Sequence, residues 1–346
     1  MILITTKSGE EGKTKFSYET YFGRKEAFGS DNYKKSVADW AEIELALTGE
    51  LTNNTKYAQE LVAVTGVDRD WQDVFFDGGN ISSHSFSARG GTKKTKFSVS
   101  LRTLGDEGVV ITDDYRIYSG KLKLDTRITD RLKFGISATP SYSERRALPT
   151  SIHNPIRQSP WLLIYHTEET LPYIDRESYP DIEVGDYFRE DHLRSIDIDT
   201  TDEFGASRPR TSGDMNPFAQ YVEREHYEFK TKLLSQTYLS YKIMDGLTAK
   251  SSLGLTLENR KRTRWNGTQH HHTFASRASY QLQNRFRTRL ISDNTLSYNL
   301  GVGNHDFNAL LGVTIQRRES ENSVIDGLGY TNDSVSYTHL TLPTKA

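Results

Sequence analysis

The sequence predicts an all-β protein, a partial transmembrane antiparallel up-and-down β-barrel of about nine strands of a larger barrel. Three observations indicate this fold class: long segments in which apolar and polar residues alternate, the length of those segments, and the order of short and long connections. Successive side chains of a strand point to opposite faces, so an alternating segment has one apolar and one polar face. A membrane barrel needs such strands because lipid contacts its outside and water its lumen.

The alternation is clearest between Lys94 and Glu144, where three predicted strands follow one another. Their apolar or small positions are Phe97, Val99, Leu101 and Thr103, then Tyr118, Gly120, Leu122, Leu124, Thr126 and Ile128, then Leu132, Phe134, Ile136 and Ala138. The residues between these positions are polar or charged, as in Arg102 and Lys123. Each segment runs for about 9–13 residues, which is long for a globular strand and sufficient to cross a bilayer at a tilt.

Further strands and two helices are predicted from the same periodicity. The predicted strands are Thr14–Phe22, Asn80–Gly90, Glu225–Met244, Leu247–Asn259, Phe286–Leu300 and His305–Gln316. Helical spacing occurs at Asp31–Leu47, with Ser30 or Asp31 as the N-cap, and more weakly at Asn53–Val64.

The connections alternate in length. Short turns are predicted at 90–93, 129–131, 245–246 and 301–304, and longer connections at 23–79, 105–116, 145–223 and 263–284. A barrel with short periplasmic turns and long extracellular loops produces this alternation. We therefore expect all the long loops at one end of the strands.

The composition limits the functional classes. The chain has 346 residues, a formal net charge of -2 and no cysteine, so disulfides and thiol chemistry are excluded and nothing favours a nucleic-acid partner. The sequence contains no run of about 18 apolar residues, so it predicts no transmembrane helix. Met1–Thr6 lacks the basic region and cleavage site of a signal peptide, so we expect an exported form to start further upstream.

Several motifs resemble one family. Ile2–Lys13 followed by Thr14–Gly23 resembles the junction between plug and barrel in the SusC/RagA family of TonB-dependent outer-membrane receptors. The segments Asp70–Asp73, Gly90–Phe97 and Asn216–Gln220 resemble further motifs of the same family. The chain departs from the family pattern at Arg89, usually serine there, and at Lys93, often glutamate, and neither change affects the alternation.

The resemblance implies a fragment of a receptor. Residues 1–13 would be the end of the plug, 14–335 the first part of the barrel with extracellular loops 23–79 and 145–223, and 336–346 a non-native tail. It further implies an outer-membrane location in contact with lipid, import of oligosaccharides or peptides, a SusD-like surface lipoprotein as partner, and energy supplied through TonB. It implies no enzymatic activity and no cofactor.

Two alternatives remain at this point. One is a soluble all-β domain that binds or degrades carbohydrate, which would pair carboxylates across one cleft. The other is a porin or adhesin barrel that transports nothing, against which a plug strand at Ile2–Thr6 argues.

Candidate site residues lie in the predicted loops. Groups of histidine and acidic residues are interpreted as solvated surface, with calcium binding by the acidic groups left open as the alternative. They are His270, His271 and His272, then Asp186, Glu190, Asp191 and His192, then Asp197, Asp199 and Asp202. The best candidates for contact with cargo are the loop aromatics Trp161, Tyr165, Tyr173, Tyr179, Tyr187, Phe188 and Trp265. Packing within the loop is the commoner role for any single one, so no substrate-binding residue is assigned.

Overall fold

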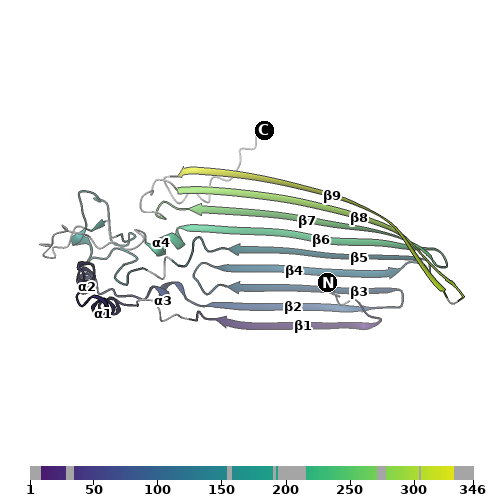
Figure 1. The fold of residues 1–346 in the computed structure, drawn as a ribbon, viewed down its shortest axis with the longest axis horizontal. Helices are drawn as coiled ribbons and strands as arrows, with labels where there is room; N and C mark the ends of the chain where they lie inside the picture. Colours follow the sequence, from purple (N-terminus) through teal and green to yellow (C-terminus); the bar gives the residue numbers. More distant parts are fainter. Residues whose placement is uncertain are drawn as a thin grey trace.

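The computed structural model describes residues 9–28, 35–153, 158–189, 192–193, 216–270, 278–303 and 305–330. The predicted plug strand Ile2–Thr6 and the tail 336–346 lie outside the described residues. Nine strands form one sheet in sequence order, each antiparallel to its neighbour (Figure 1). The strands are β1 (Gly12–Lys25), β2 (Gly79–Gly91), β3 (Thr95–Glu107), β4 (Asp114–Arg127), β5 (Leu132–Arg146), β6 (Arg224–Met244), β7 (Leu247–Asn266), β8 (Ala278–Val302) and β9 (His305–Tyr330).

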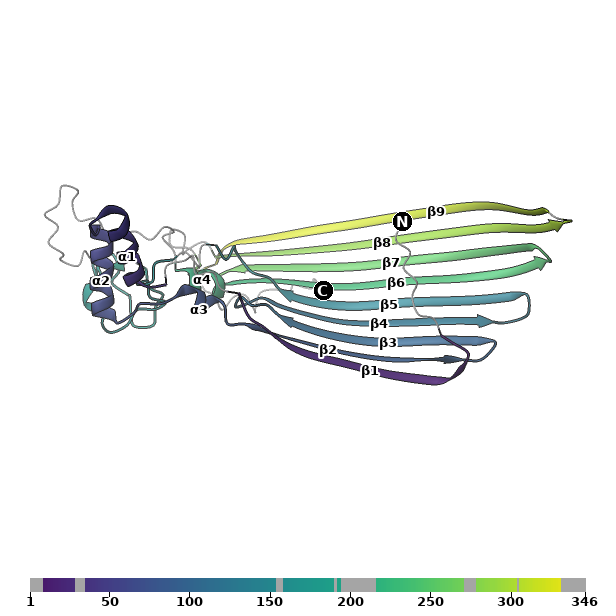
Figure 2. The same ribbon diagram turned by 60° about the horizontal axis from the view of Figure 1, so that its bottom comes forward.

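The sheet is a curved wall with different connections at its two ends (Figures 1 and 2). One end carries the short turns that join β2 to β3, β4 to β5, β6 to β7 and β8 to β9. The other end carries the long connections, whose helices are α1 (Val37–Thr48), α2 (Asn53–Thr65), α3 (Trp71–Phe75) and α4 (Pro217–Val222). The predicted barrel class, its nine strands and its segregated loops are confirmed, and the sheet is open, as expected of a partial barrel.

Several boundaries differ from the prediction. The first helix begins at Val37 rather than Asp31, because Ser36 is its N-cap and forms a reciprocal capping box with Asp39. The last three strands are longer than predicted, so half of the expected loop at 263–284 is strand, at 263–266 and 278–284. Beyond Gln316, β9 carries polar residues on both faces, and backbone pairing with β8 continues without the alternation that marked the rest of the strand.

The register places the apolar positions of all nine strands on one face. Phe97 pairs with Leu124, and Leu124 with Ile136, so the three alternating rows predicted from the sequence adjoin one another. We refer to the apolar stretch of this face as the belt, which runs from Phe16–Phe22 on β1 to Phe307–Ile315 on β9. Its side chains remain open to the surroundings, with Phe16 at 69% and Leu311 at 69% exposure.

Charged residues on the belt face occupy one end of it. Within the described strands, every Asp, Glu, Lys or Arg side chain on this face lies on the loop side of the belt. These residues are Arg24, Glu107, Asp114, Arg116, Glu144, Arg146, Glu225, Lys261, Arg317, Glu319 and Glu321. A charge facing lipid is costly, so this distribution is that of a surface that contacts hydrocarbon at the belt and water or headgroups above it.

The belt also reports the tilt of the strands. The chain of directly paired residues that starts at Phe16 on β1 crosses the sheet and reaches Arg317 on β9. The belt on β9, however, begins at Phe307, ten residues nearer the short turn. Across eight strand pairs the belt therefore shifts by about one residue per strand. With about 3.3 Å per residue and about 4.8 Å between strands, the strands tilt by about 35–40° from the normal to the belt, as in membrane barrels.

Among the described residues, no helix has the length and apolar character needed to cross a lipid bilayer.

A charge introduced into the belt tests its orientation. Ile136→Arg places a guanidinium on the belt face, and we expect it to lower the free energy of unfolding in lipid vesicles by about 2–4 kcal/mol. The adjacent Ser137→Arg places the same group on the opposite face and should cost less than about 1 kcal/mol. Urea unfolding followed by tryptophan fluorescence measures both values, and equal losses for the two variants would contradict the assignment of the faces.

Candidate functional site

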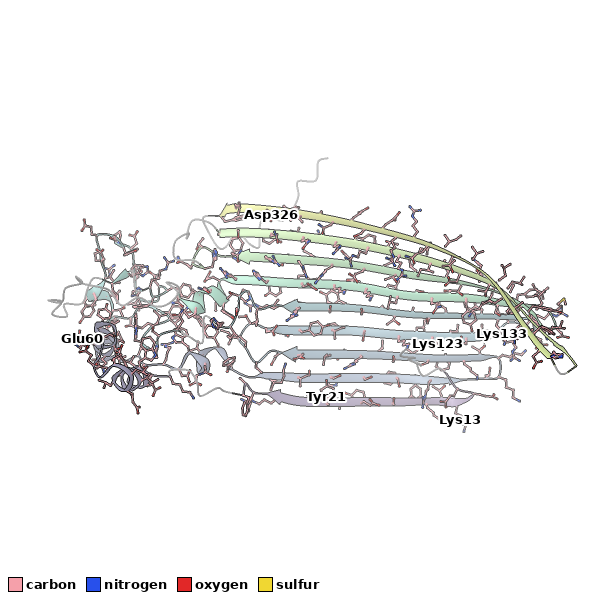
Figure 3. The ribbon with its side chains drawn as sticks, in the orientation of Figure 1. Lys13, Tyr21, Glu60, Lys123, Lys133 and Asp326 are labelled. Atoms are coloured by element: carbon pink, nitrogen blue, oxygen red, sulfur yellow. The ribbon has the colours of Figure 1, made fainter. Side chains whose placement is uncertain are left out.

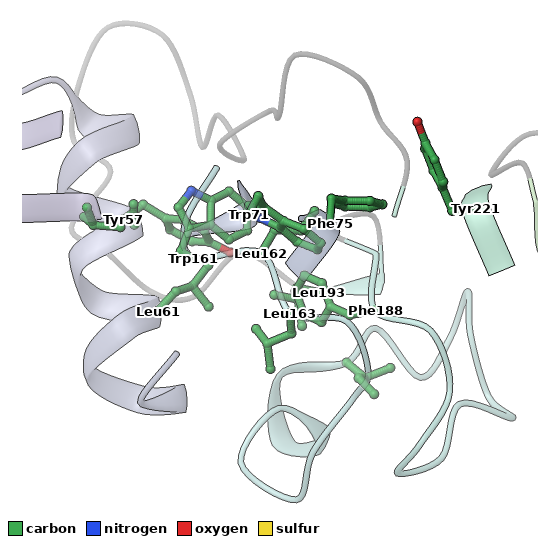
Figure 4. Close-up of a cluster of buried hydrophobic side chains, with 13 residues drawn as sticks. Tyr57, Leu61, Trp71, Phe75, Trp161, Leu162, Leu163, Phe188, Leu193 and Tyr221 are labelled. Carbon is green, nitrogen blue, oxygen red and sulfur yellow. The ribbon is translucent and has the colours of Figure 1, made fainter. Parts of the chain in front are cut away.

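The two longest connections fold together at the loop end of the wall. We refer to the described residues of 35–78 and 147–223 as the loop body. Its hydrophobic cluster joins Leu61, Trp71 and Phe75 of the first connection to Trp161 and Tyr221 of the second (Figure 4). The rings of Tyr57 and Trp161 lie 6.4 Å apart, and those of Phe75 and Tyr221 lie 4.9 Å apart, both edge to face. The loops are therefore one packed body and not independent arms.

Two of the motifs that resemble the SusC/RagA family supply helix caps that hold this body together. Asp70 caps α3 by accepting a hydrogen bond from the Gln72 amide, which directs Trp71 inward, where its indole Nε1 donates to the Ser159 carbonyl at 3.0 Å. In the second motif, Asn216 caps α4 by accepting from the amides of Phe218 and Ala219.

Asn216 also connects three segments through its other amide atom. Its Nδ2 donates to the Ile164 carbonyl at 2.7 Å and to the Phe188 carbonyl at 3.2 Å. Pro217 suits the first turn of α4, where no amide donor is needed. One buried side chain thus fixes the entrance to β6 relative to the middle of the loop body.

The predicted cargo-contacting aromatics divide into two groups. Trp161, Phe188 and Trp265 are buried, with exposures of 2%, 0% and 6%, so packing is their role. Tyr165 is 42% exposed and stacks on Tyr187 with ring centroids 5.2 Å apart. Tyr173 and Tyr179 are half-buried. Among these candidates Tyr165 presents the most open ring to a ligand.

Tyr187 is held in place by its hydroxyl group. The hydroxyl donates to Oε1 of Glu223, the residue immediately before β6, at 2.9 Å. Burial, together with the neighbouring Glu223 carboxylate, raises the pKa of Tyr187 far above its usual range. The phenol therefore stays neutral, and its ring stacks on that of Tyr165.

The structure corrects the interpretation of His192 as solvated surface. His192 is 5% exposed, and its Nδ1 lies 2.9 Å from Nε2 of His166, which is 1% exposed. Glu190 and Asp191, predicted as part of the same cluster, lie outside the described residues, and Asp186 is exposed and accepts from the Glu183 amide. Sequence spacing could not reveal this pair, because its members are 26 residues apart.

The histidine pair has one consistent proton arrangement. The Thr170 hydroxyl donates to the Thr167 carbonyl, so it accepts from Nδ1 of His166, 3.1 Å away. Nε2 of neutral His166 then accepts from Nδ1 of His192. Burial lowers the pKa of His166 to about 4 and that of His192 to about 3, against the attraction of Asp186 for His166 and with the repulsion of Arg176 and Arg189.

Metal binding finds no support in the part of the chain that the structure describes, where no group of three or more His, Asp or Glu side chains is placed around a common point. His270 is half-buried, with Nδ1 2.5 Å from the Gly267 carbonyl oxygen. His271, His272, Asp197, Asp199 and Asp202 lie outside the described residues.

A cleft of about 520 Å³ opens beside the histidine pair. It lies between the loop body and the connection from β7 to β8, and its lining includes Tyr179, Asp186, Tyr187, Arg189 and Gln269. Arg189 Nη2 donates to Oε1 of Gln269 at 3.4 Å across it. The cleft combines ring faces with polar groups, a combination suited to sugar or peptide ligands.

The polar face of the wall carries its own side-chain contacts. On β6, Tyr238 lies opposite Gly135 on β5, and Gly135 lies opposite Asp125 on β4. The Tyr238 ring crosses Gly135 and its hydroxyl donates to Oδ1 of Asp125 at 2.8 Å. Lys250 on β7 covers the ring at 5.0 Å. Figure 3 shows polar side chains such as Lys123 and Lys133 on the strands near the short-turn end.

The chain before β1 also lies on the polar face. Glu10 pairs with Arg89, a polar-face residue of β2, at 3.8 Å. Gly9 is buried against the backbone of β3 so closely that a Cβ atom would lie 2.5 Å from the Phe97 carbonyl oxygen. The described part of the predicted plug junction therefore enters on the side opposite the belt.

Comparison with known proteins matches this architecture. No family model matches the chain. Among curated proteins it is similar to TonB-dependent receptor P3 of Formosa agariphila, with 22% identity over 98% of this chain and 30% of that protein. It is 28% identical over 50% of its length to TonB-dependent receptor SusC of Bacteroides thetaiotaomicron, covering 17% of that receptor. The resemblance found in the sequence is thereby supported: the curated proteins that match are TonB-dependent receptors.

Solved structures agree on the fold. The RagAB peptide transporter superposes with a TM-score of 0.67 at 15% identity, over 95% of this chain and 38% of that one. The RagAB peptide importer in its open-open state gives a TM-score of 0.67 at 16% identity, over 95% of this chain and 37% of that one. The chain thus spans 17–38% of the length of these relatives. The names of these relatives describe receptors, a transporter and an importer, in keeping with the outer-membrane receptor that the sequence motifs resemble.

Substitution of Gly135 tests the crossing of the wall by Tyr238. A Cβ atom at Gly135 would lie 2.1 Å from Cε1 of Tyr238, so Gly135→Ala must displace the ring and break its bond to Asp125. We expect a loss of about 1–3 kcal/mol of unfolding free energy in lipid vesicles. Gly254→Ala is the matched control, because the nearest atoms to its added Cβ, both of Ile291, are 3.9 Å away. If Gly135→Ala costs as much in a Tyr238→Ala background, where no ring crosses the glycine, as it does alone, the steric explanation is wrong.

The histidine pair predicts a pH dependence of the loop body. An unfolded histidine has a pKa of about 6.5, so both folded-state pKa values are depressed and the folded loop body favours the neutral form of both rings. The contribution of the pair to the folding stability of the loop body is then complete above pH ~6.5. It falls as the pH decreases toward about 4, because protonated His166 would direct a second N–H at the donor of His192.

Fluorescence of the buried tryptophans, Trp71 and Trp161, measured between pH 7.5 and about 4 follows this loss. His166→Gln combined with His192→Gln should remove the dependence in that window. His153→Gln, at an exposed position of the same connection, should retain it. An unchanged titration in the double variant would contradict the assignment.

Proposed function

We propose that the chain forms part of the wall and the extracellular loops of an outer-membrane transporter that takes up oligosaccharides or peptides by a TonB-dependent mechanism. The observation that carries the proposal is the division of one tilted sheet into an uncharged belt on one face and a charged, hydrogen-bonded surface on the other. Lipid contacts the first and a polar lumen contacts the second.

The soluble alternative conflicts with the arrangement of the sheet. A soluble domain would cover the rows of Phe97 and Phe134 with a second layer. Among the described residues each strand contacts its neighbours in the sheet, and no other sheet or helix covers the belt. The long exposed apolar face is then accounted for by lipid.

The loop body and the polar face supply the surfaces that such a transporter needs. Cargo arriving from outside first meets the loop body, where Tyr165 is exposed and the cleft beside Tyr187 is open. It then meets the polar face of the wall, along which no belt residue points. Segment 9–11, on that same face, supports the proposal that residues 1–13 end a plug within the lumen.

A SusD-like surface lipoprotein is the proposed partner. Two relatives carry the names SusC and RagAB, and the second is described as a peptide transporter. The loop body offers an uncovered apolar strip on α1, where Ile43 is 43% and Leu47 79% exposed. An apolar strip of this kind at the loop end fits contact with a lid above the lumen.

Fractionation and uptake test the proposal. The receptor that carries this sequence should be found in the outer-membrane fraction and should shift in mobility when heated before electrophoresis, as folded barrels do. Uptake of a fluorescent oligosaccharide or peptide should disappear when the TonB gene is deleted, with the receptor still in the membrane. Recovery of the receptor in the soluble fraction, or uptake that is indifferent to TonB, would exclude this function.

A further inference from the structure

Cations gather on the polar face of three neighbouring strands. We refer to the following eight residues as the basic patch: Lys230 and Lys232 on β6, Arg260, Arg262 and Arg264 on β7, and Arg285, Arg287 and Arg289 on β8. The register brings them together, since Lys230 lies opposite Arg260 and Arg260 opposite Arg285. All eight lie on the face opposite the belt.

The positive charge of the basic patch is only partly balanced. Two carboxylates lie within it, Glu228 and Glu258, so eight cations face two anions and an excess of six positive charges remains. Glu228 accepts from Arg260 at 2.5 Å and from Arg262 at 2.7 Å. Glu258 lies 3.5 Å from Lys230 and 3.9 Å from Arg287. Each carboxylate is therefore already shared between two cations.

Unused hydrogen-bond donors remain at the centre of the basic patch. Nε of Arg260 and Nε of Arg285, on residues directly opposite each other, are buried atoms without a hydrogen-bond partner. On the next strand Arg318 lies opposite Arg289, which adds a further cation at the edge. Like charges at this density repel one another, so an anion that binds among them gains both attraction and donors.

The position of the basic patch determines what can reach it. On β7 the belt ends at Leu257, and the patch begins beyond it, on the loop side and on the opposite face. It therefore lies in the mouth of the lumen, outside the depth of the hydrocarbon, where water and cargo enter. Lipid headgroups contact the other face.

The surroundings of the basic patch favour a glycan over a peptide. Its neighbours on the polar face are mostly amides and hydroxyls, such as Gln281, Gln283 and Thr256, and apolar side chains are few. Peptide side chains are usually received in apolar pockets, whereas sugar hydroxyls need many polar partners. Guanidinium groups bind carboxylate and sulfate with two parallel hydrogen bonds.

We propose that the basic patch binds an acidic oligosaccharide, whose carboxylate or sulfate groups pair with its arginines as the cargo enters the lumen. The proposal rests on the transporter function proposed above and names the class of its cargo. Arg264, Arg287 and Arg289 are its exposed members, and the last two are near neighbours on β8. They would make the first contacts.

Binding measurements on the receptor that carries this sequence, purified in detergent, test the proposal. The probes are tetragalacturonate, a sulfated galactan tetrasaccharide, neutral maltotetraose and tetraglutamate, each followed by calorimetry. We expect one or both acidic tetrasaccharides to bind, and to bind more weakly as salt is raised. Arg287→Gln with Arg289→Gln should weaken that binding about tenfold or more, because two charge-assisted donors are lost.

A matched control uses the same face away from the basic patch. Lys96→Gln with Arg102→Gln removes two cations from β3 and should change the affinity by less than about twofold. Heat-dependent mobility in electrophoresis verifies that each variant is folded, and Lys232→Gln replaces the double variant if that one is not.

Three outcomes would overturn the proposal. Maltotetraose could bind as tightly as the acidic tetrasaccharides, tetraglutamate could bind more tightly than either, or the double variant could keep its full affinity because another part of the receptor neutralises the patch. In each of these cases the receptor would still fractionate with the outer membrane and depend on TonB for uptake. Failure of this inference is thus distinguishable from failure of the transporter function.

Discussion

The structure depends on the pairing of every backbone N–H and C=O group that faces lipid, because hydrocarbon offers no partner. Eight antiparallel pairs in unbroken sequence order satisfy this requirement for the interior of the wall. The remaining features follow from it. Side chains must alternate between lipid and lumen, the belt must cross the hydrogen-bonded rows obliquely, and a ring as large as that of Tyr238 can cross a strand only where Gly135 leaves room.

Stability is divided between two different environments. The wall has no dry interior of its own, since lipid takes the place of a core on one face and water wets the other. Buried aromatic residues concentrate instead in the loop body, where Trp71 and Phe75 pack with Trp161 across about ninety residues of sequence. Capping at Ser36, Asp70 and Asn216 gives these loops defined helix starts, so the loop end of the wall has fixed geometry.

The sequence was sufficient for the wall and insufficient for the loops, for physical reasons. Period-two alternation is a local signal, so Phe97, Leu124 and Ile136 were assigned to one face before any register was known. The loop-side ends of β7, β8 and β9 were not predicted, because beyond the belt the backbone pairing continues without an alternation of apolar and polar residues. Burial of Trp161 and the contact of His166 with His192 depend on segments distant in sequence, which periodicity cannot bring together.

The distribution of charge over the two faces of the wall also could not be predicted from composition. A formal net charge of -2 gave no reason to expect a nucleic-acid partner and did not show where charge is concentrated, because composition averages over both faces of every strand and over the loops. Once the register sorts side chains by face, the basic patch brings eight cations and two carboxylates together on one surface of β6, β7 and β8, and the belt on the opposite face presents no charge. The acidic residues that restore the balance must lie elsewhere, many of them in the connection 147–223, which includes Glu168, Glu169, Asp181 and Glu183. Cargo near the wall responds to the local field of the surface it meets and not to the sum over the chain, since charges beyond about a Debye length are screened.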